Sequence, residues 1–328
     1  MPAIHLARLA AVTLLFFGLA ACSSDDDPAP STGTTGSARQ NIDIELGVVQ
    51  SLSGTAQVYG ESVVKGIELA VKEINPSGEV QITVETKDDK SEVQTGVDAV
   101  KSFGDSDVTA IIGPTLSNVA LEAMKAAQEA GVPILGATTT AAGITDIDDY
   151  VFRIALTEAV VVPAMIERVS GDEQIEDAVL IFDSSDAFSS SSADAMRTGI
   201  EKIGASISAE IDTDVDDLEA RMASLDKATI DAFLVTPLVD ASAEIVKAIR
   251  AAGFEQPIVG GNSFNTLSIA TMAGADIDGA YVGAAWNPGL QAEASKRFVA
   301  AYEKEYGSAP DQFAAHAFQQ LRHRQYLL

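Results

Sequence analysis

The chain has 328 residues, 47% of them hydrophobic, and its 48 acidic and 21 basic side chains give a formal net charge of −27. This length and apolar content are enough for two packed lobes. Proteins that bind nucleic acid or anionic lipid need clustered Lys and Arg, so the acidic composition argues against both kinds of partner. Solubility accounts for such a charge, and a salt-rich habitat is the alternative explanation.

The N-terminus has the pattern of a bacterial export signal. Arg8 precedes an apolar run over residues 9–21 that is too short to span a bilayer as a mature helix. The run ends in Leu19-Ala20-Ala21-Cys22, which resembles a lipobox, where signal cleavage leaves a cysteine to be acylated. We therefore expect residues 1–21 to be a lipoprotein signal peptide and the chain to be extracytoplasmic, anchored through Cys22 to a bacterial membrane. In the alternative interpretation, Cys22 is an ordinary small residue.

Cys22 is the only cysteine of the chain. The mature protein therefore has no disulfide and no thiolate metal site, and redox chemistry is not expected. Residues 22–40 are rich in Ser, Thr, Gly and Pro, a composition that cannot bury a core and predicts a flexible tether. The globular part is expected to begin near Asn41.

The stretch from Ile44 to Asn75 predicts a strand, a polar loop and a helix. Residues 44–49 form an apolar run suited to a buried strand, and residues 51–54 break it. From Gly60 onward, apolar residues recur every three or four positions and build one helix face. In an open α/β sheet, such a loop lies at the carboxyl end of a strand, where these folds bind small ligands.

The same alternation of strand and helix continues along the chain. Further strands are predicted at residues 80–85, 108–112, 132–135, 150–154, 178–182, 206–211, 232–236 and 257–259. Helical patterns lie between them, among them residues 91–103, 117–130, 218–225 and 241–252. This rhythm predicts two mainly parallel sheets with helices on both faces. Joined near Thr157, two such units would leave a cleft between their polar strand-end loops.

The segment GVVQSLSGTAQVYGESVVKGIELAVKEIN combines Ser53-Gly54, Tyr59-Gly60 and a helix at a specific spacing. It resembles the opening of the type I solute-binding proteins, the family of the leucine/isoleucine/valine-binding protein. The resemblance extends through KSFGDSDVTAIIGPTLSNVALEAMKAAQEAGVPILGATTT, YVFRIALTEAVVVPAMI and AVLIFDSSDAFSSSSADAMRTGIEKIGA. It implies the α/β two-lobed type I periplasmic-binding-protein fold, each lobe a mainly parallel sheet flanked by helices, with a hinge between them.

The resemblance also implies the domain boundaries. Lobe 1 would span residues 41–157 and lobe 2 residues 158–286, with Gly279 to Trp286 as the crossing back. Residues 287–328 would return to lobe 1. The family continues beyond this point, whereas the chain ends in QQLRHRQYLL, so we expect a truncation or a frameshift there.

Ser117 is the first candidate for ligand binding. It follows Gly113-Pro114 and opens a helix whose free N–H groups and positive dipole end favour a carboxylate. Thr138 and Thr140 lie on the neighbouring strand-end loop, where hydroxyl groups can fix a carboxylate or an amine. Ser117 and Thr140 match ligand-binding positions of the family. The alternatives are a plain helix cap for Ser117 and solvated loop residues for the threonines.

The resemblance adds further ligand-binding candidates. Ser53 and Tyr59 belong to the opening signature, and Tyr59 takes the place of an aromatic wall in the family. Phe188 takes the place of an aromatic residue of the second lobe, although Tyr59 and Phe188 are equally compatible with core positions. Glu158 lies where family members commonly carry Asp and could pair with a ligand ammonium group. The alternative for Glu158 is a first-turn helix acid.

Two positions depart from the family. Asn262 stands where relatives that bind amino acids use an acid for the ammonium group, and Leu238 replaces an expected aromatic residue. A neutral amide cannot balance the ammonium charge in a dry cleft. An amide, a carboxylic acid without an ammonium group and an amino acid that uses Glu158 all remain open as ligands.

The sequence gives little support for catalysis. Its three histidines are His5, His316 and His323, which assemble no triad or zinc cluster with the strand-end loops. The serine cluster at residues 184–192 lacks the GxSxG elbow of a hydrolase, and no phosphate-binding loop occurs. The acidic run at residues 212–217 lacks the glycine and distal Glu of a calcium loop, and a solvated turn is the simpler interpretation. We expect no enzyme activity, no cofactor and no metal.

The predicted function is that of a monomeric, extracytoplasmic solute-binding component of an ABC importer. It would bind an amino acid or a related small carboxylate or amide between the lobes and work with membrane permease subunits. The alternative is a lipoprotein sensor or regulatory interaction module that uses the same fold without transport.

Overall fold

The structure is a computed structural model that describes residues 42–322. The predicted signal peptide, the proposed lipidation site Cys22 and the tether lie outside the described residues, as do His5 and His323.

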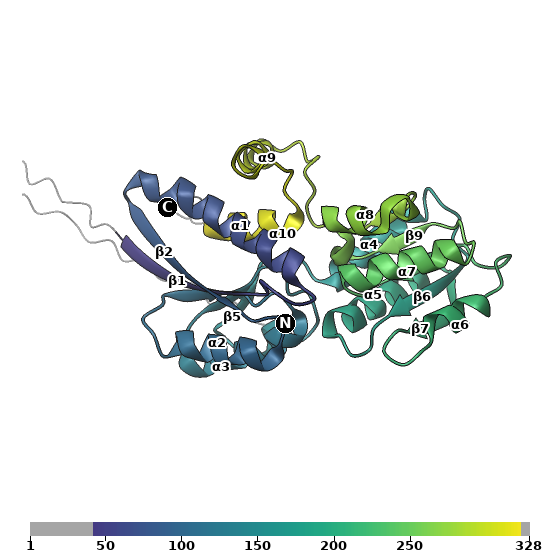
Figure 1. The fold of residues 1–328 in the computed structure, drawn as a ribbon, viewed down its shortest axis with the longest axis horizontal. Helices are drawn as coiled ribbons and strands as arrows, with labels where there is room; N and C mark the ends of the chain where they lie inside the picture. The colour runs from purple at the N-terminus through teal and green to yellow at the C-terminus, as the bar shows by residue number, and fades with distance from the viewer. Residues whose placement is uncertain (1–41, 323–328) are drawn as a thin grey trace, which may run out of the picture. The chain divides into compact units, whose positions relative to one another are not determined.

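The first lobe is built on a five-stranded parallel sheet in the order β2-β1-β3-β4-β5. Its strands are β1 (Ile42–Gln50), β2 (Val80–Asp88), β3 (Ala110–Ile112), β4 (Ile134–Gly136) and β5 (Val151–Arg153). Figure 1 shows α2 (Val93–Gly104) and α3 (Ser117–Ala130) on one face of this sheet, and α1 (Gln57–Ile74) with α10 (Gln312–Arg322) on the other. Segments from both ends of the described chain therefore build this lobe.

The second lobe contains another five-stranded parallel sheet, in the order β10-β9-β8-β6-β7. Its strands are β6 (Asp177–Phe182), β7 (Ser206–Asp212), β8 (Ala232–Val235), β9 (Ile258–Gly260) and β10 (Tyr281–Val282). The flanking helices are α4 (Glu158–Val169), α5 (Ala187–Ile203), α6 (Leu218–Ala223), α7 (Val239–Ala251) and α8 (Leu267–Ala273).

Strand β6 shows why this second sheet must be covered on both faces. Ala178 and Leu180 are fully buried in the core cluster that includes α4 and α5. The alternate residues Val179 and Ile181 are fully buried in the cluster that includes α6, α7 and α8. Side chains of a strand point alternately to opposite faces, so a continuous apolar run requires helices on both sides.

The remaining elements are short connections and one long helix. The single-turn helices are η1 (Asn75–Ser77), η2 (Ile144–Asp146), η3 (Asn262–Phe264) and η4 (Gly274–Ile277). Helix α9 (Glu293–Tyr306) packs with α1 and α10 around a small core that contains Phe298, Tyr302 and Phe318. Gly66 lets α1 approach α10 closely, since a Cβ there would lie 2.3 Å from the carbonyl oxygen of Ala314.

The predicted α/β two-lobed architecture with parallel sheets is confirmed. Each strand predicted from the sequence has a counterpart in one of the two sheets. Helices α8, α9 and α10 were not predicted individually. No helix within residues 42–322 is both long and apolar enough to cross a membrane.

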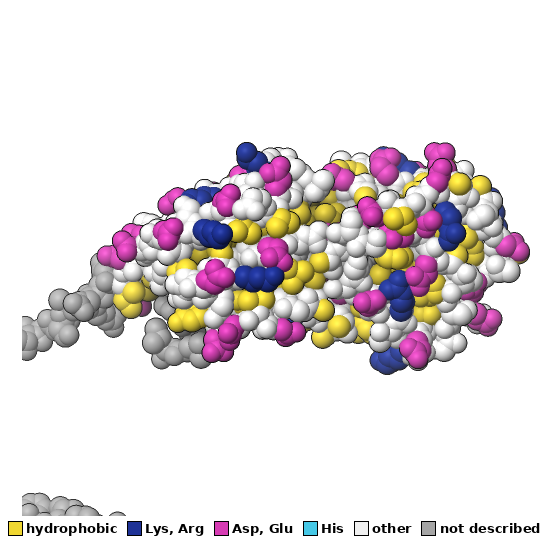
Figure 2. Space-filling view, turned by 90° about the horizontal axis from the view of Figure 1, so that it is seen from below, with side chains coloured by type: hydrophobic (Ala, Val, Ile, Leu, Met, Phe, Trp, Pro, Cys, Tyr) yellow, Lys and Arg dark blue, Asp and Glu magenta, His cyan; other side chains and the backbone are white. Residues whose placement is uncertain are grey.

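Charged side chains of both signs are interspersed on the surface. Figure 2 shows Asp and Glu spread over one face, with Lys and Arg between them. Arg197, for example, lies 2.7 Å from both Asp194 and Glu210. Such exposed pairs contribute about 0–1 kcal/mol each, so they bear more on solubility than on the stability of the fold.

Candidate functional site

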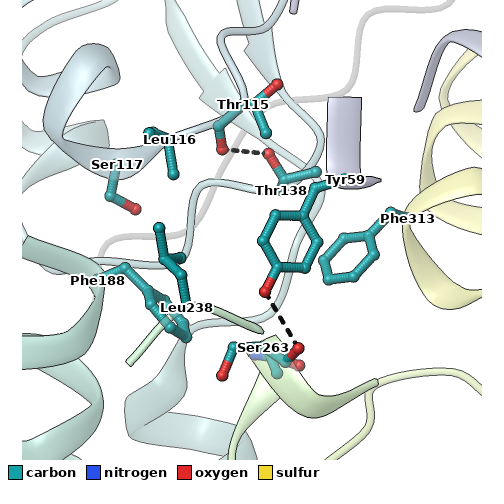
Figure 3. A pocket seen from close by; sticks show the side chains of 10 residues that line it. Tyr59, Thr115, Leu116, Ser117, Thr138, Phe188, Leu238, Ser263 and Phe313 are labelled. Atoms are coloured by element: carbon teal, nitrogen blue, oxygen red, sulfur yellow. Dashed lines mark hydrogen bonds between the residues drawn. The ribbon is translucent and has the colours of Figure 1, made fainter. Parts of the chain in front are cut away.

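A pocket lies where the carboxyl ends of strands from both sheets meet. It encloses about 350 Å³ of space, part of it open to solvent. The first lobe and α10 contribute Tyr59, Thr115, Leu116, Ser117, Thr138 and Phe313, and the second lobe contributes Phe188, Leu238, Asn262 and Ser263 (Figure 3). The lining combines aromatic and aliphatic side chains with a few polar groups, the composition that small-molecule sites commonly have.

Five of the residues predicted to bind a ligand line this one pocket: Tyr59, Ser117, Thr138, Phe188 and Asn262. They come from four helices or single-turn helices and one loop, and the structure brings them together. The other three predicted residues, Ser53, Thr140 and Glu158, are not among the lining residues.

Ser117 is placed by a buried polar network at the end of β1. The Gln50 amide accepts a hydrogen bond from the Thr115 hydroxyl (2.7 Å), and Thr115 Oγ1 accepts one from the Ser51 backbone N–H (2.9 Å). These bonds fix the loop after β3, and α3 begins immediately after it at Ser117. Ser117 Oγ accepts a 3.4 Å hydrogen bond from the Ala141 backbone N–H, which leaves the hydroxyl proton available to a ligand.

Thr138 faces Thr115 across the pocket wall. Its hydroxyl donates a 2.5 Å hydrogen bond to the Thr115 carbonyl oxygen (Figure 3). The hydroxyl proton is therefore already used, and Thr138 Oγ1 can meet a ligand only as an acceptor while this bond holds.

Tyr59 links the two lobes at one side of the pocket. Its hydroxyl donates to the Ser263 carbonyl oxygen (3.2 Å) and accepts from the Val239 backbone N–H (2.8 Å). Burial raises the pKa of Tyr59 well above its ordinary value of 10, so the phenol is uncharged at neutral pH. The ring packs edge-to-face against Phe313, with 4.9 Å between the centroids.

Phe313 and Phe188, the other two aromatic residues of the pocket, lie near the N-termini of their helices. The Asp311 carboxylate accepts hydrogen bonds from the backbone N–H groups of Phe313 and the next residue, both at 3.0 Å, at the beginning of α10. On the second lobe, the Asp186 carboxylate accepts a 2.7 Å hydrogen bond from the Ser189 backbone N–H and caps α5, which carries Phe188. Capping acids therefore orient the two phenylalanines toward the pocket.

Glu158 and Asn262 form a buried network behind the pocket. The Asn262 amide donates to Glu158 Oε1, and the Ser192 hydroxyl donates to Glu158 Oε2 (3.0 Å). The Gln312 amide donates to Asn262 Oδ1 (3.1 Å), which fixes the direction of the Asn262 amide. Burial raises the pKa of Glu158, and the hydrogen bonds from Asn262 and Ser192 oppose part of that rise.

Thr140 lies on the same side as this network. It is 4% exposed, and its hydroxyl forms no hydrogen bond of good geometry with any described residue. It lies near enough to the Glu158 carboxyl to oppose the rise in the pKa of that group. Thr140 thus contacts the layer behind the pocket rather than the pocket itself.

Ser53 lies in a different network. Its hydroxyl donates a 2.7 Å hydrogen bond to Asp88 at the end of β2, and its carbonyl oxygen accepts from the Ser91 hydroxyl (2.9 Å). Next to it, the Ser51 hydroxyl donates to Asp89 (2.6 Å). The structure gives Ser53 a place in the β1–α1 loop, where it joins that loop to β2.

Sequence reasoning did not single out four of the lining residues: Thr115, Leu116, Ser263 and Phe313. Leu116 and Ser263 are directly adjacent to a predicted residue, and Thr115 lies two positions before Ser117, so the strand-end position was the available signal. Phe313 had no such signal, because it reaches the pocket only through the packing of α10 on α1.

Hydrogen bonds other than those of Tyr59 also join the lobes. Asn118 Oδ1 accepts a 2.6 Å hydrogen bond from the Ala187 backbone N–H, and its Nδ2 donates to the Ser185 carbonyl oxygen (3.3 Å). The Ser191 hydroxyl accepts from the Ala142 backbone N–H (3.1 Å). These bonds hold the lobes together beside the pocket.

The described residues contain no group of three or more potential ligands that could hold a metal ion. The acidic run after β7 instead builds its own loop. Asp217 caps α6 by accepting from the Ala220 backbone N–H (3.1 Å), and Asp212 accepts from the Ser184 backbone N–H (3.0 Å). This is the solvated turn that the sequence favoured.

Comparisons with known proteins cover most of the chain. The sequence profile of a family described as "Periplasmic binding protein" matches residues 43–324. Leu/Ile/Val-binding protein homolog 7 of Brucella suis is 27% identical over 301 residues, which cover 84% of this chain and 74% of that protein. Leu/Ile/Val-binding protein BraC3 of Rhizobium johnstonii is 32% identical over 108 residues, which are 32% of this chain and 29% of the length of BraC3.

Among solved structures, the chain is similar to the branched-chain amino acid transporter substrate binding protein LivJ of Streptococcus pneumoniae, which was crystallised in complex with isoleucine. The TM-score is 0.78 at 28% sequence identity, and the match covers 85% of this chain and 82% of that one.

Proposed function

The chain belongs to the periplasmic binding protein family, a non-enzymatic solute-binding family, and we propose that it is the extracytoplasmic substrate-binding component of an ABC importer. In this proposal, it captures a small solute that carries a carboxylate and presents it to membrane permease subunits. Cys22 carries the lipid anchor, and the protein acts as a monomer.

The observation that carries this proposal is the position of Ser117. It is the first residue of α3, it is buried, and it lines the pocket. The first turn of a helix has N–H groups without intrahelical partners and the positive end of the helix dipole, both of which favour an anion. The free proton of the Ser117 hydroxyl adds a donor directed at the same place.

The two lobes supply the conformational part of the mechanism. In this proposal, the described residues before 158 and after 286 form lobe 1, and residues 158–286 form lobe 2. Ligand binding favours the closed arrangement only to the extent that the ligand contacts both lobes in it. The pocket meets this condition, since it is lined from both sides, and a permease can recognise the closed form.

The relatives support a carboxylate-bearing solute. Those named above are described as Leu/Ile/Val-binding, and LivJ was crystallised with isoleucine, an amino acid with a carboxylate and an apolar side chain. The lining of the pocket offers both a place for a carboxylate at Ser117 and apolar surface from Leu116, Phe188 and Leu238.

Native mass spectrometry of the protein purified from bacterial culture tests the proposal, since this measurement detects a bound solute of any identity. We expect a discrete small-molecule adduct that denaturing dialysis removes. In Ser117→Ala, loss of a hydrogen bond to a charged group should weaken binding by about 1.5–3 kcal/mol, roughly 10- to 150-fold. The matched control is Ser224→Ala, which changes an exposed serine of the second lobe.

A folded protein that carries no adduct, and that remains empty after exposure to amino acids, amides and organic acids, would contradict the proposal. That result would favour a lipoprotein sensor or regulatory interaction module with the same fold. An adduct that Ser117→Ala leaves unchanged would keep a binding function but remove Ser117 from it.

A further inference from the structure

The pocket is lined by uncharged groups. Among the ten lining residues, all of which the structure describes, there is no Lys, Arg, His, Asp or Glu. Tyr59 is the one lining residue that can ionise. Its hydroxyl already accepts a hydrogen bond from the Val239 N–H and donates one to the Ser263 carbonyl oxygen. A ligand in this pocket therefore meets neutral polar atoms, aromatic rings and aliphatic side chains.

The nearest acid is Glu158, and it is shielded from the pocket. It is 1% exposed and does not line the cavity, whereas Asn262, which does, stands in front of it. Both carboxyl oxygens accept hydrogen bonds, one from Asn262 and one from Ser192. An ammonium group could reach Glu158 only by displacing the Asn262 amide from it.

Asn262 itself is poorly suited to an ammonium group. Its amide oxygen, the atom that would accept from a cation, already accepts from Gln312 at 3.1 Å. The amide has left one N–H of Nδ2, because the other donates to Glu158, and the second lone pair of Oδ1, which carries no full charge to balance an ammonium group. An N–H donor and an ammonium group repel each other.

Two hydroxyl groups on the other sides of the pocket have a proton that is free to be donated to a ligand. The Ser117 hydroxyl has no acceptor for its proton among the described residues, and α3 begins there. The Ser263 hydroxyl is a second such group: the residue is 3% exposed, lines the pocket and has no hydrogen-bond partner within residues 42–322 (Figure 3). A buried hydroxyl without a partner indicates a place where a ligand atom completes the hydrogen bonding.

From this arrangement, we propose that the pocket selects small monocarboxylic acids with an apolar body and no ammonium group over the corresponding α-amino acids. The inference rests on the proposed solute-binding function and specifies its substrate class. The carboxylate binds at Ser117 and the start of α3, and the apolar body packs among Phe188, Leu238 and Phe313.

The physical basis is the cost of burying the second charge of a zwitterion. An anion is stabilised at the N-terminus of α3 without any basic side chain. An ammonium group in the same closed pocket would lose its hydration and find only neutral hydroxyl oxygens, and a buried charge without a counter-charge is strongly disfavoured. Removal of the ammonium group from the ligand removes this cost and leaves the carboxylate contacts unchanged.

Isothermal titration calorimetry of the full chain at pH 7 tests the inference with pairs of compounds that share a body. The acids are propanoate, 4-methylpentanoate and 3-phenylpropanoate, and their partners are L-alanine, L-leucine and L-phenylalanine. The amide 4-methylpentanamide tests whether the carboxylate is needed. We expect at least one acid to bind at least tenfold more tightly than its amino acid partner and 4-methylpentanamide to bind more weakly than 4-methylpentanoate.

A variant of Glu158 tests whether this shielded acid contributes to the choice of ligand. Glu158→Gln keeps the shape and an acceptor for Asn262 but removes the carboxylate. If Glu158 is shielded as described, the affinity for the carboxylic acid divided by the affinity for its amino acid partner should change by less than about threefold. This is well below the tenfold change that corresponds to 1.4 kcal/mol. A selective loss of amino acid binding in this variant would show that Glu158 serves an ammonium group and would overturn the inference.

The remaining outcomes are also decisive. Tighter binding of L-leucine than of 4-methylpentanoate, or of the amide than of the acid, would overturn the inference while leaving the solute-binding function intact. Binding of none of the compounds by a protein that thermal unfolding shows to be folded would overturn the inference, and an absent adduct in native mass spectrometry would then reject the proposed function as well.

Discussion

Replacement of Tyr59 by Phe should weaken closure of the lobes more than it weakens the fold. The substitution keeps the ring that packs on Phe313 and removes only the hydroxyl, which bonds to two backbone groups of the second lobe, those of Val239 and Ser263. Val239 is fully buried, so its N–H would be left without water or protein as a partner in the closed form.

The magnitude follows from the number of bonds lost. Each hydrogen bond contributes about 0.5–1.5 kcal/mol net, so the two together amount to about 1–3 kcal/mol. Tyr59 is on α1 of the first lobe, and both partners belong to the second lobe, so the loss falls on the closed arrangement. Where the open arrangement predominates without ligand, the affinity for a ligand that needs the closed form should fall by about 5- to 150-fold.

Two measurements on Tyr59→Phe check this reasoning. Calorimetry with the tightest-binding acid of the panel above gives the change in affinity, and small-angle X-ray scattering without ligand gives the change in the fraction of closed molecules. The control is Tyr306→Phe, which removes a 2.9 Å hydrogen bond to the Lys65 carbonyl oxygen within the helices around α1. If Tyr59→Phe lowers the unfolding temperature but changes neither affinity nor closure, the hydroxyl does not couple the lobes.

Two further substitutions test the packing and the buried network. Gly66→Ala should lower the free energy of unfolding by about 1–3 kcal/mol, because the new Cβ would overlap the Ala314 carbonyl oxygen and force α1 and α10 apart. Urea denaturation measures this change. A stabilisation of about 1 kcal/mol, as expected for Ala over Gly in the interior of a helix, would contradict the prediction. Burial raises the pKa of Glu158 above its unfolded value near 4.5, so its stabilising contribution is complete below that pH and is lost as the pH rises through the folded pKa. Glu158→Gln should therefore become more stable relative to the unmodified protein as the pH rises from 4.5 to 8. A stability difference that does not change with pH would refute the assignment, and Glu129→Gln, at an exposed position, is the matched control variant.

Local sequence patterns predicted the strands of both sheets and most of the helices, but not α8, α9 and α10. The buried residues of β6 form a continuous apolar run, and this pattern alone indicates a central strand covered on both faces. The helix predicted over residues 117–130 is α3, and the next residue, Gly131, adopts the left-handed conformation that is common at helix ends and that glycine allows. These features depend on neighbours within a few residues, so they do not require the tertiary structure.

The pocket could be predicted only in part, for a physical reason. Ser117 and Thr138 follow buried strands, and the carboxyl ends of parallel strands meet at one edge of a sheet, so their proximity follows from the topology. Phe313 depends instead on α10 packing against α1, a contact between distant parts of the chain that Gly66 permits. Periodicity within α10 shows that the helix has an apolar face but does not show where that face packs.

The role of Glu158 shows most clearly what a motif leaves undetermined. Its position predicted an acid near the ligand, and it does lie next to the pocket, but Asn262, 104 residues away, donates to it and stands between it and the cavity. With an acid at position 262, the pocket would carry a negative charge. The amide of Asn262 instead donates a hydrogen bond to Glu158 and offers an N–H group to the pocket. The charge offered to the ligand is thus decided by the pair and by Gln312, which fixes the direction of the amide. Specificity in this site should accordingly respond to substitution of Asn262, or of Gln312, which fixes its direction, more than to substitution of the shielded Glu158.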